Sequence, residues 1–359
     1  RHFLKRRISD LEICHSGWLN GSMSTLNLQV ITKTCAWLEQ GDRVFFITVL
    51  NTWGASPRPV GSLLAYNLDK EIQVGSLSGG CIEDDLFSFL KEAAQDNNLA
   101  AFFTKKYGST DEEATRYLLP CGGTLELLIE TIFDSSTNEH FASLKDALHA
   151  RQTIARSLDL SDTQQKRYSL LDREKVIGKN ELLYTASTQQ FYHRLDPTYR
   201  LLLVGVGDVT RYLSEFAETL GFDITICDPR AAYNKRFQVE SLPYKVSYQL
   251  PDDLIKHSFL DSFSAILCLA HDPKVDDMAL LEALTHSSAF YIGAMGSVKT
   301  SQSRVDRLMS LGLTQEQLNN LHAPIGLDIN SKTPQEIAIA ISAELIASRD
   351  RHKLSTLSE

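Results

Sequence analysis

The pattern of apolar and polar residues divides the chain into two blocks of strong structural signal with a weaker stretch between them. In the first block, apolar residues recur at helical spacing from Leu26 to Leu38, and Gly41 can supply the C-cap of that helix. Apolar runs bounded by polar or proline-rich turns then predict buried strands over residues 43–50, 62–66 and 125–132. The stretch from about 134 to 196 is polar, and we expect short strands and a connection there.

The second block begins with a nearly continuous apolar run over residues 200–205, as expected of a parallel strand that is covered on both faces. A helical pattern follows and ends at Gly221, and further strands are predicted over residues 224–227, 265–270 and 290–293. A strand, a helix and a strand within about 30 residues form a βαβ unit. Near the C-terminal end, Thr333-Pro334-Gln335-Glu336 predicts a capped helix.

These patterns predict an α/β protein with an N-terminal mixed α/β domain and a C-terminal Rossmann-like domain built on a parallel sheet. We place a leader at residues 1–22, the N-terminal domain at 23–135, short strands and a connection at 136–196, the C-terminal domain at 197–348 and a tail at 349–359. The leader lacks the apolar core and small-residue cleavage site of a secretory signal. We expect it to be unstructured or foreign to the natural chain.

Composition narrows the class of protein. The 359 residues are 43% hydrophobic and 23% charged, which is enough for a sizeable core, and the net charge of -9 argues against nucleic-acid binding by bulk charge. No apolar run approaches the roughly 20 residues that span a bilayer. Six scattered cysteines do not form the pattern of a secreted disulfide framework. We therefore expect a soluble cytoplasmic protein that binds neither nucleic acid nor membrane.

The first candidate site is a junction of glycines, a cysteine and a helix. Gly79 and Gly80 precede Cys81, and the apolar spacing that follows predicts a helix beginning at or just after this cysteine. A thiol at a helix N-terminus has a lowered pKa, and paired glycines leave backbone amides to bind an anion. The alternative is a buried structural cysteine followed by an acidic helix cap.

A second junction of the same kind, Cys121-Gly122-Gly123, precedes the strand at 125–132. The two junctions together offer soft thiolate donors beside backbone amides, which suits a soft metal, a persulfide or an anionic cofactor that carries sulfur and phosphate. Cys81 and Cys121 are therefore the candidate metal ligands, whereas neither a structural zinc site nor a disulfide is expected. The other cysteines are assigned to the leader, a helix and core strands, and these are Cys14, Cys35, Cys227 and Cys268.

Arg58 lies in a loop stiffened by two prolines and two glycines between predicted strands. An arginine held in a stiff loop loses less conformational freedom when it binds an anion, and its guanidinium can bind phosphate with two hydrogen bonds. The alternative is a rigid turn that carries a solvated arginine.

The C-terminal block carries part of a dinucleotide-binding fingerprint. Gly205 and Gly207 lie between a strand and a helix, and Asp228 ends the next strand about 20 residues further on. Thr210 replaces the third glycine, and Asp208 puts a negative charge where a diphosphate would lie. A nucleotide-like fold is therefore expected, whereas binding of NAD(P) is the lesser alternative.

His271 follows a predicted strand and lies at the carboxyl edge where α/β sheets place their ligands. It is a candidate acid, base or ligand, with the anchoring of a loop as the alternative. The loops at 293–297 and 324–328 are predicted at the same edge. The chain has no Walker, G-x-S-x-G or triad signature, which removes the kinase and hydrolase classes.

Taken together, these motifs resemble the XdhC/CoxI family of maturation factors for molybdenum hydroxylases, over roughly residues 28–348. The motifs that carry the resemblance are residues 56–62, 78–85 and 120–126 in the first half, and residues 227–230, 271–274, 293–297 and 324–337 in the second. The chain departs from the family at residues 205–210, where Gly-Val-Gly-Asp-Val-Thr stands in place of the frequent Gly-Ala-Gly-His-Val-Ala. This departure weakens the expectation of nucleotide binding.

The resemblance implies a carrier without turnover of its own, which binds the molybdenum cofactor, protects it during sulfuration and inserts it into a xanthine dehydrogenase or a related hydroxylase. It implies contacts with that client and with a cysteine desulfurase, and a homodimer is expected. By the same resemblance, Arg58 would contact the cofactor's phosphate, while Cys81 and Cys121 would contact the metal or handle sulfur. The alternatives are an NAD(P)-dependent oxidoreductase that uses Asp228 and His271, and a scaffold that bridges the two partners without binding the cofactor.

Overall fold

The computed structural model describes residues 23–53, 58–77, 81–96, 98–108, 124–164, 167–172, 182–185, 189–236, 244 and 246–356. The N-terminal part is a five-stranded antiparallel sheet with strand order β3-β2-β1-β5-β4. Its strands are β1 (Val44–Trp53), β2 (Leu63–Asn67), β3 (Ile72–Gly75), β4 (Phe102–Tyr107) and β5 (Thr124–Ile132). Helices α1 (Met23–Glu39) and α2 (Cys81–Ala93) pack on opposite faces of this sheet.

The stretch from 134 to 196 contains a helix as well as the predicted short strands. After the short 3-10 helix η2 (Ser135–Thr137) comes α4 (Asn138–His149), which packs beside α1. Only Phe141, Leu144 and Leu148 of α4 are buried, and three apolar residues among polar ones are a weak helical signal. A four-stranded antiparallel sheet of order β7-β6-β9-β8 follows, with strands β6 (Ile154–Asp159), β7 (Arg167–Asp172), β8 (Leu182–Thr185) and β9 (Gln190–Leu195).

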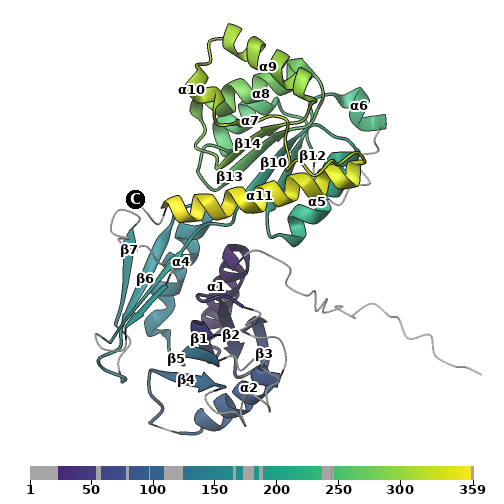
Figure 1. The fold of residues 1–359 in the computed structure, drawn as a ribbon. Coiled ribbons are helices and arrows are strands. Elements are labelled where there is room, and N and C mark those ends of the chain that lie inside the picture. The colour runs from purple at the N-terminus through teal and green to yellow at the C-terminus, as the bar shows by residue number, and fades with distance from the viewer. Residues whose placement is uncertain are drawn as a thin grey trace, which may run out of the picture.

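The C-terminal part is a parallel sheet with helices on both faces (Figure 1). Its strand order, β12-β11-β10-β13-β14-β15, is the doubly wound order of Rossmann folds, in which the order of strand addition reverses between β10 and β13. The strands are β10 (Arg200–Val204), β11 (Asp223–Cys227), β12 (Val246–Ser247), β13 (Ser264–Cys268), β14 (Tyr291–Ala294) and β15 (Leu321–His322). The helices are α5 (Asp208–Thr219), α6 (Ala231–Arg236), α7 (Pro251–Ser258), α8 (Pro273–His286), α9 (Val298–Ser310), α10 (Gln315–Leu318) and α11 (Pro334–Thr356). The predicted fold class is confirmed.

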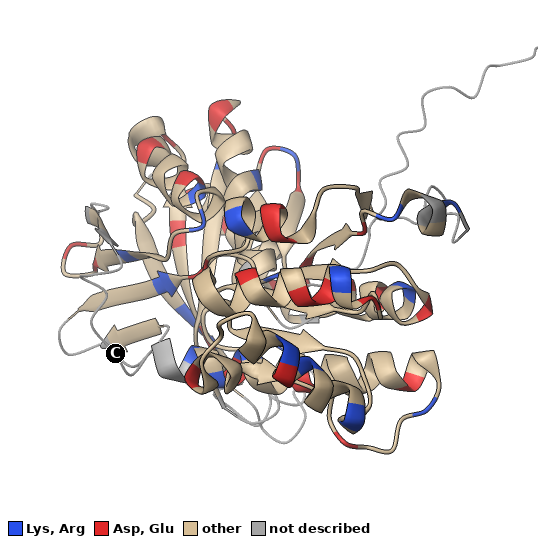
Figure 2. Ribbon diagram, turned by 90° about the horizontal axis from the view of Figure 1, so that it is seen from above, with Lys and Arg blue, Asp and Glu red and all other residues tan. Residues whose placement is uncertain are grey.

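Charged residues are interspersed over the surface helices. Figure 2 shows acidic and basic positions alternating along the described helices, without a stripe of one sign. The described helices in this view show no basic track of the kind that binds a phosphate backbone, and the chain as a whole has a net charge of -9.

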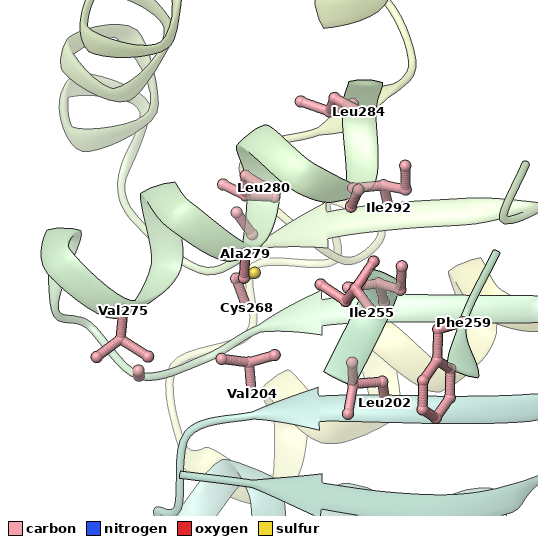
Figure 3. Close-up of a cluster of buried hydrophobic side chains, with 14 of the residues drawn as sticks. Leu202, Val204, Ile255, Phe259, Cys268, Val275, Ala279, Leu280, Leu284 and Ile292 are labelled. Atoms are coloured by element: carbon pink, nitrogen blue, oxygen red, sulfur yellow. The ribbon is translucent and has the colours of Figure 1, made fainter. Parts of the chain in front are cut away.

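The parallel sheet separates two hydrophobic cores. On one face, Leu202, Val204 and Cys268 pack with residues of α7, α8 and α9 (Figure 3). On the other face, Leu201 and Leu203 pack with residues of α5 and α11. Side chains at successive positions of a strand point to opposite faces, so an apolar run is the pattern that a sheet covered on both sides requires.

The two halves of the chain meet near the amino edge of the parallel sheet. The Thr25 hydroxyl of α1 donates a hydrogen bond of 2.7 Å to the carbonyl of Gly221, and Arg151 donates to both carboxylate oxygens of Asp261 at 2.8 and 2.9 Å. A cavity of about 640 Å³ lies at this junction, and Arg200 and Asp223 are among its lining residues. None of the predicted site residues that the structure describes is among the residues that line this cavity.

Candidate functional site

The segments that carry the N-terminal motifs leave the described sheet at one and the same end. Trp53 at the end of β1 pairs with Thr124 at the start of β5, and β3 runs parallel to β1 and ends at Gly75. The chain therefore enters residues 54–57, enters 78–80 and leaves 121–123 at this end of the sheet. The antiparallel register thus places the described residues that flank three distant motifs, Trp53, Leu77 and Thr124, toward one end of the sheet.

Several predicted site residues lie outside the described residues. These are Gly79, Gly80, Cys121, Gly122 and Gly123. The predicted helix start is confirmed, because Cys81 is the first residue of α2 and Ile82, Leu86 and Leu90 are buried on its inner face. The assignment of Cys81 and Cys121 as metal ligands stays a prediction.

Glu83 holds the turn that leads into the first glycine–cysteine junction. Its side chain is buried in the first turn of α2, where one carboxylate oxygen accepts hydrogen bonds from the Leu77 amide at 2.7 Å and the Ser76 hydroxyl at 2.8 Å. The other oxygen accepts a bond of 3.1 Å from the Gln73 side chain. In the sequence Glu83 is only one member of an acidic cap, whereas the structure makes it the residue that positions residues 76–77.

Arg58 is half-buried at the start of a tight turn back into β2. Gly61 in that turn donates its amide to the carbonyl of Val49 at 2.9 Å, and the Ser62 hydroxyl donates to the carbonyl of Pro59 at 2.8 Å. The turn is therefore fixed to the sheet by hydrogen bonds. The stiffness expected of the whole loop and anion binding by Arg58 both stay predictions.

Asp228 lies at the carboxyl edge of the parallel sheet, where it is fully buried and accepts hydrogen bonds from the protein itself. One of its oxygens accepts the Val206 amide at 2.9 Å and Nη2 of Arg230 at 2.7 Å, and the other accepts the amide and Nε of Arg230 at 3.0 and 2.9 Å. Burial raises the pKa of Asp228, but hydrogen bonds from Arg230 and Val206 outweigh burial and leave the pKa below its usual value. In a dinucleotide site this carboxylate must instead accept ribose hydroxyls.

Thr210 fits where the fingerprint places its third glycine. Its side chain is 2% exposed, and its hydroxyl donates a hydrogen bond of 2.7 Å to the carbonyl of Gly205. Gly205 itself has a φ of +105° and lies against the backbone of Ala270. The helix therefore packs closely on the turn despite the threonine, although the sequence suggested a steric obstacle.

His271 lies at the same edge, directly after β13, in the left-handed region with a φ of +54°. It is exposed, and burial of part of the ring, followed by the nearby guanidinium groups of Arg304 and Arg230, lowers its pKa. Arg304 is 3% exposed and donates Nη1 and Nη2 to the carbonyl of Met295 at 3.2 Å. His271 therefore has two cationic neighbours at the predicted ligand edge.

Arg304 lies beside an incompletely paired acidic group. Its distance to an oxygen of Asp276 is 3.5 Å, and burial raises the pKa of Asp276 to about 6. Among the described residues, that oxygen of Asp276 and Nε of Arg304 have no hydrogen-bond partner. In the sequence Arg304 is only one of several basic residues after 293–297, because nothing in the local pattern indicates that it is buried.

The other loop of the predicted edge is held by Glu344 of α11, which belongs to none of the sequence motifs. Glu344 accepts hydrogen bonds from the Tyr291 hydroxyl and the Gly326 amide, both at 2.6 Å, and lies 2.7 Å from Nδ1 of His322. This network fixes the segment after the last strand against the sheet. It pairs residues that are more than 50 positions apart, as Tyr291 and Glu344 show, so no local pattern indicates it.

Within the part of the chain that the structure describes, no group of three or more His, Cys, Asp or Glu side chains is arranged to hold a metal ion. Cys35, Cys227 and Cys268 are free thiols in buried positions, as predicted. Burial is the main cause that raises the pKa of Cys35 to about 11 and of Cys227 to about 12. A raised pKa disfavours the thiolate, which is the reactive form of cysteine. None of the described helices is both long and apolar enough to span a membrane.

An antiparallel sheet followed by a doubly wound parallel sheet of the Rossmann type defines a two-part α/β protein. A family model described as the XdhC Rossmann domain matches residues 201–345, and one described as the XdhC and CoxI family matches residues 37–107. The chain belongs to the XdhC and CoxI family, and the resemblance seen in its motifs is confirmed.

Relatives and a solved structure match along most of the chain. A Bacillus subtilis (strain 168) protein, named as a probable subunit of xanthine dehydrogenase, is 24% identical over 333 residues, covering 89% of this chain and 97% of its own length. The molybdenum cofactor insertion chaperone PaoD of Escherichia coli (strain K12) is 24% identical over 322 residues, covering 87% of this chain and 85% of its own length. A crystal structure from Bacillus halodurans, described as a xanthine dehydrogenase, shares the fold with a TM-score of 0.68 at 23% identity, covering 90% of this chain and 96% of that one.

Proposed function

We propose that this protein carries the molybdenum cofactor during the maturation of a molybdenum hydroxylase of the xanthine dehydrogenase type. The observation that carries the proposal is the likeness to the insertion chaperone PaoD, which extends over 87% of this chain and so includes both halves. The likeness to the Bacillus subtilis protein, whose name refers to xanthine dehydrogenase, supports the class of client. Protection of the cofactor during sulfuration, contact with a cysteine desulfurase, a homodimer and a cytoplasmic location stay predictions.

The chemistry of the residues at one end of the N-terminal sheet suits this cargo. Molybdopterin carries a phosphate, for which a guanidinium and backbone amides are suited, and a dithiolene that holds a metal centre, for which thiolates are suited. Arg58 stands in a fixed turn at this end, and Cys81 begins α2 directly after residues 78–80. We assign the phosphate to Arg58 and the metal or its sulfur to Cys81 and Cys121, with the glycines of both junctions supplying amides.

The structure does not favour an NAD(P)-dependent oxidoreductase. Such an enzyme needs the acidic residue after the second strand to be open to a ribose, whereas Asp228 is fully buried and accepts four hydrogen bonds from within the protein. The amide of Val206, in the middle of the glycine turn, is also engaged by this carboxylate.

The test is cofactor retention by the full chain. The protein is produced in cells that make the molybdenum cofactor, and released oxidised pterin and molybdenum are measured on the same sample. We expect both to accompany the protein in equal amounts, and the loaded protein to restore activity to a cofactor-free molybdenum hydroxylase. Protein that carries neither pterin nor molybdenum, and that does not restore activity, would contradict the proposal.

Variants assign the roles within the site. Cys81→Ala and Cys121→Ala are expected to lose cofactor, with Cys35→Ala as the control because Cys35 is a buried thiol of α1. Arg58→Gln is expected to weaken retention roughly tenfold, as the loss of a charged phosphate contact does. Arg211→Gln is its control, since Arg211 is an exposed arginine of α5. Retention equal to that of the controls would remove the assigned residues from the site.

A further inference from the structure

Arg230 crosses the crevice in which a Rossmann fold holds a dinucleotide. It follows β11, yet its Nη1 donates a hydrogen bond of 3.1 Å to the carbonyl of Ala270, which follows β13. Strand β10 lies between β11 and β13 in the sheet. The guanidinium therefore spans the carboxyl end of β10, above the turn that begins at Gly205. This is the point in the sheet where the order of strand addition reverses.

The position of Arg230 is fixed by three groups. Nε and Nη2 bind the carboxylate of Asp228 at 2.9 and 2.7 Å, and the ring of Tyr233 lies 4.4 Å from the guanidinium carbon. A guanidinium has five N–H donors, and the side-chain bonds to Asp228 and Ala270 use three of them. Its side chain remains 22% exposed, so a cation with further donors faces the crevice.

The neighbouring loops add to this cation. His271 is the residue after Ala270, and its lowered pKa reflects burial first and then Arg304 and Arg230, so both guanidinium groups act on the imidazole. Arg304 is 3% exposed and is held by ion pairs, with its Nε 3.6 Å from an oxygen of Asp277 and its Nη2 3.5 Å from an oxygen of Asp276. Its charge is therefore shared with these two carboxylates, and the groups that a ligand can reach at this edge are Arg230 and His271.

The crevice also has room on the side of the glycine turn. A side chain built at Gly207 would meet no atom of the described residues within 4 Å, whereas one at Gly205 would collide with Ala270. The turn is therefore closed toward the sheet and open outward. Asp208 at the first position of α5 adds a negative charge on the open side, which opposes a diphosphate lying along the turn.

We propose that Arg230 and His271 bind a single phosphoryl group at the carboxyl edge of the parallel sheet, and that Arg230 excludes dinucleotides from the same place. A guanidinium beside an imidazole is suited to the tetrahedral oxygens of a phosphate monoester. The two sources of such a group are a free phosphate monoester and the terminal phosphate of the proposed cargo, and in the second case this edge replaces Arg58 as the phosphate site. The site itself does not depend on the carrier role.

The first experiment measures binding to cofactor-free protein by titration calorimetry, with inorganic phosphate, adenosine monophosphate and NAD as probes. We expect the two probes with a terminal phosphate to bind, and NAD to bind at least about tenfold more weakly than either. Binding of NAD as tight as that of phosphate, or no phosphate binding at millimolar concentration, would overturn the proposal.

Variants test the two side chains while preserving the fold. His271→Asn keeps a residue that tolerates the left-handed backbone, and Arg230→Lys keeps a cation beside the buried carboxylate of Asp228. Each is expected to weaken phosphate binding about tenfold or more, because a directional hydrogen bond to the anion is lost. The controls are His286→Asn and Arg211→Lys at exposed positions. Variants that bind phosphate as the wild type does would contradict the assignment.

A third measurement separates the sources of the phosphate. If the group belongs to the cargo, His271→Asn lowers cofactor retention and inorganic phosphate competes with the cofactor. If it belongs to a free monoester, retention is unchanged while phosphate binding is still lost. Failure of the carrier proposal would leave phosphate binding by the wild type intact, so the two proposals fail separately.

Discussion

Replacing Glu83 tests whether the turn before the first glycine–cysteine junction is held by one carboxylate. In the structure this carboxylate accepts hydrogen bonds from the Leu77 amide at 2.7 Å, the Ser76 hydroxyl at 2.8 Å and the Gln73 side chain at 3.1 Å. Glu83 is only 8% exposed, and Glu83→Ala removes the acceptor of all three bonds. The expected result is a loss of stability together with a loss of cofactor retention.

The magnitude follows from what each partner can do afterwards. Leu77 is completely buried, so its amide cannot turn to water, and an unsatisfied buried amide costs about 1–3 kcal/mol. The Ser76 hydroxyl and the Gln73 amide are partly exposed and can bind water, so each adds only about 0.5 kcal/mol. Glu83→Ala should therefore lower the free energy of unfolding by about 2–4 kcal/mol, whereas Glu83→Gln, which keeps one acceptor oxygen, should lower it by about half as much.

The assay is urea denaturation combined with pterin quantitation on the same preparations. Asp84→Asn is the matched control, because Asp84 is the next acidic residue of the same helix and is exposed. If the reasoning holds, Glu83→Gln remains folded and yet retains less cofactor than Asp84→Asn. Glu83→Ala with the stability and retention of the control would refute the assigned role.

Three further predictions concern the rest of the fold. Arg156→Met should lower the free energy of unfolding by about 3–5 kcal/mol, because the carboxylate of Glu130, which is 0% exposed, loses its charged partner. Adding Glu130→Leu should restore much of the lost stability in urea denaturation. A double variant no more stable than Arg156→Met would contradict the prediction. Gly205→Ala should lower the free energy of unfolding by about 3 kcal/mol or more, because the new Cβ would lie 2.4 Å from the backbone of Ala270 and residue 205 has a φ of +105°. Gly207→Ala, which has open space around it, should lower the free energy of unfolding by about 0.5 kcal/mol or less in the same assay. His193 is fully buried, and burial followed by the charge of Arg156 lowers its pKa to about 3. Stability should therefore fall as the pH drops below 6.5, because His193 becomes protonated in the unfolded chain while it stays neutral in the folded protein. The free energy of unfolding is measured by denaturation at a series of pH values, and a His193→Gln variant with the same pH dependence as the wild type would refute the prediction.

Elements whose signal is local and strong could be predicted from the order of residues alone. The apolar run at 200–205 and the βαβ spacing predicted the Rossmann-type half, because a strand covered on both faces must be apolar at every position. The capping box at Thr333 is present, with Glu336 accepting the backbone amides of Lys332 and Thr333. The motifs were also sufficient to identify the family, since each depends on residue type and order rather than on distant contacts.

The use to which the site residues are put became visible only in the folded molecule. Asp228 has the position of a ribose-binding acid in the sequence, and only the fold shows that Arg230 occupies it and extends to the carbonyl of Ala270. In the sequence Glu83 belongs to an acidic run typical of a helix N-terminus. Only the folded structure shows that its carboxylate accepts hydrogen bonds from Ser76 and Leu77 in the turn before α2. A side chain's partners are set by which segments the sheet register brings together, and hydrogen bonds across such distances leave no periodic pattern in the chain.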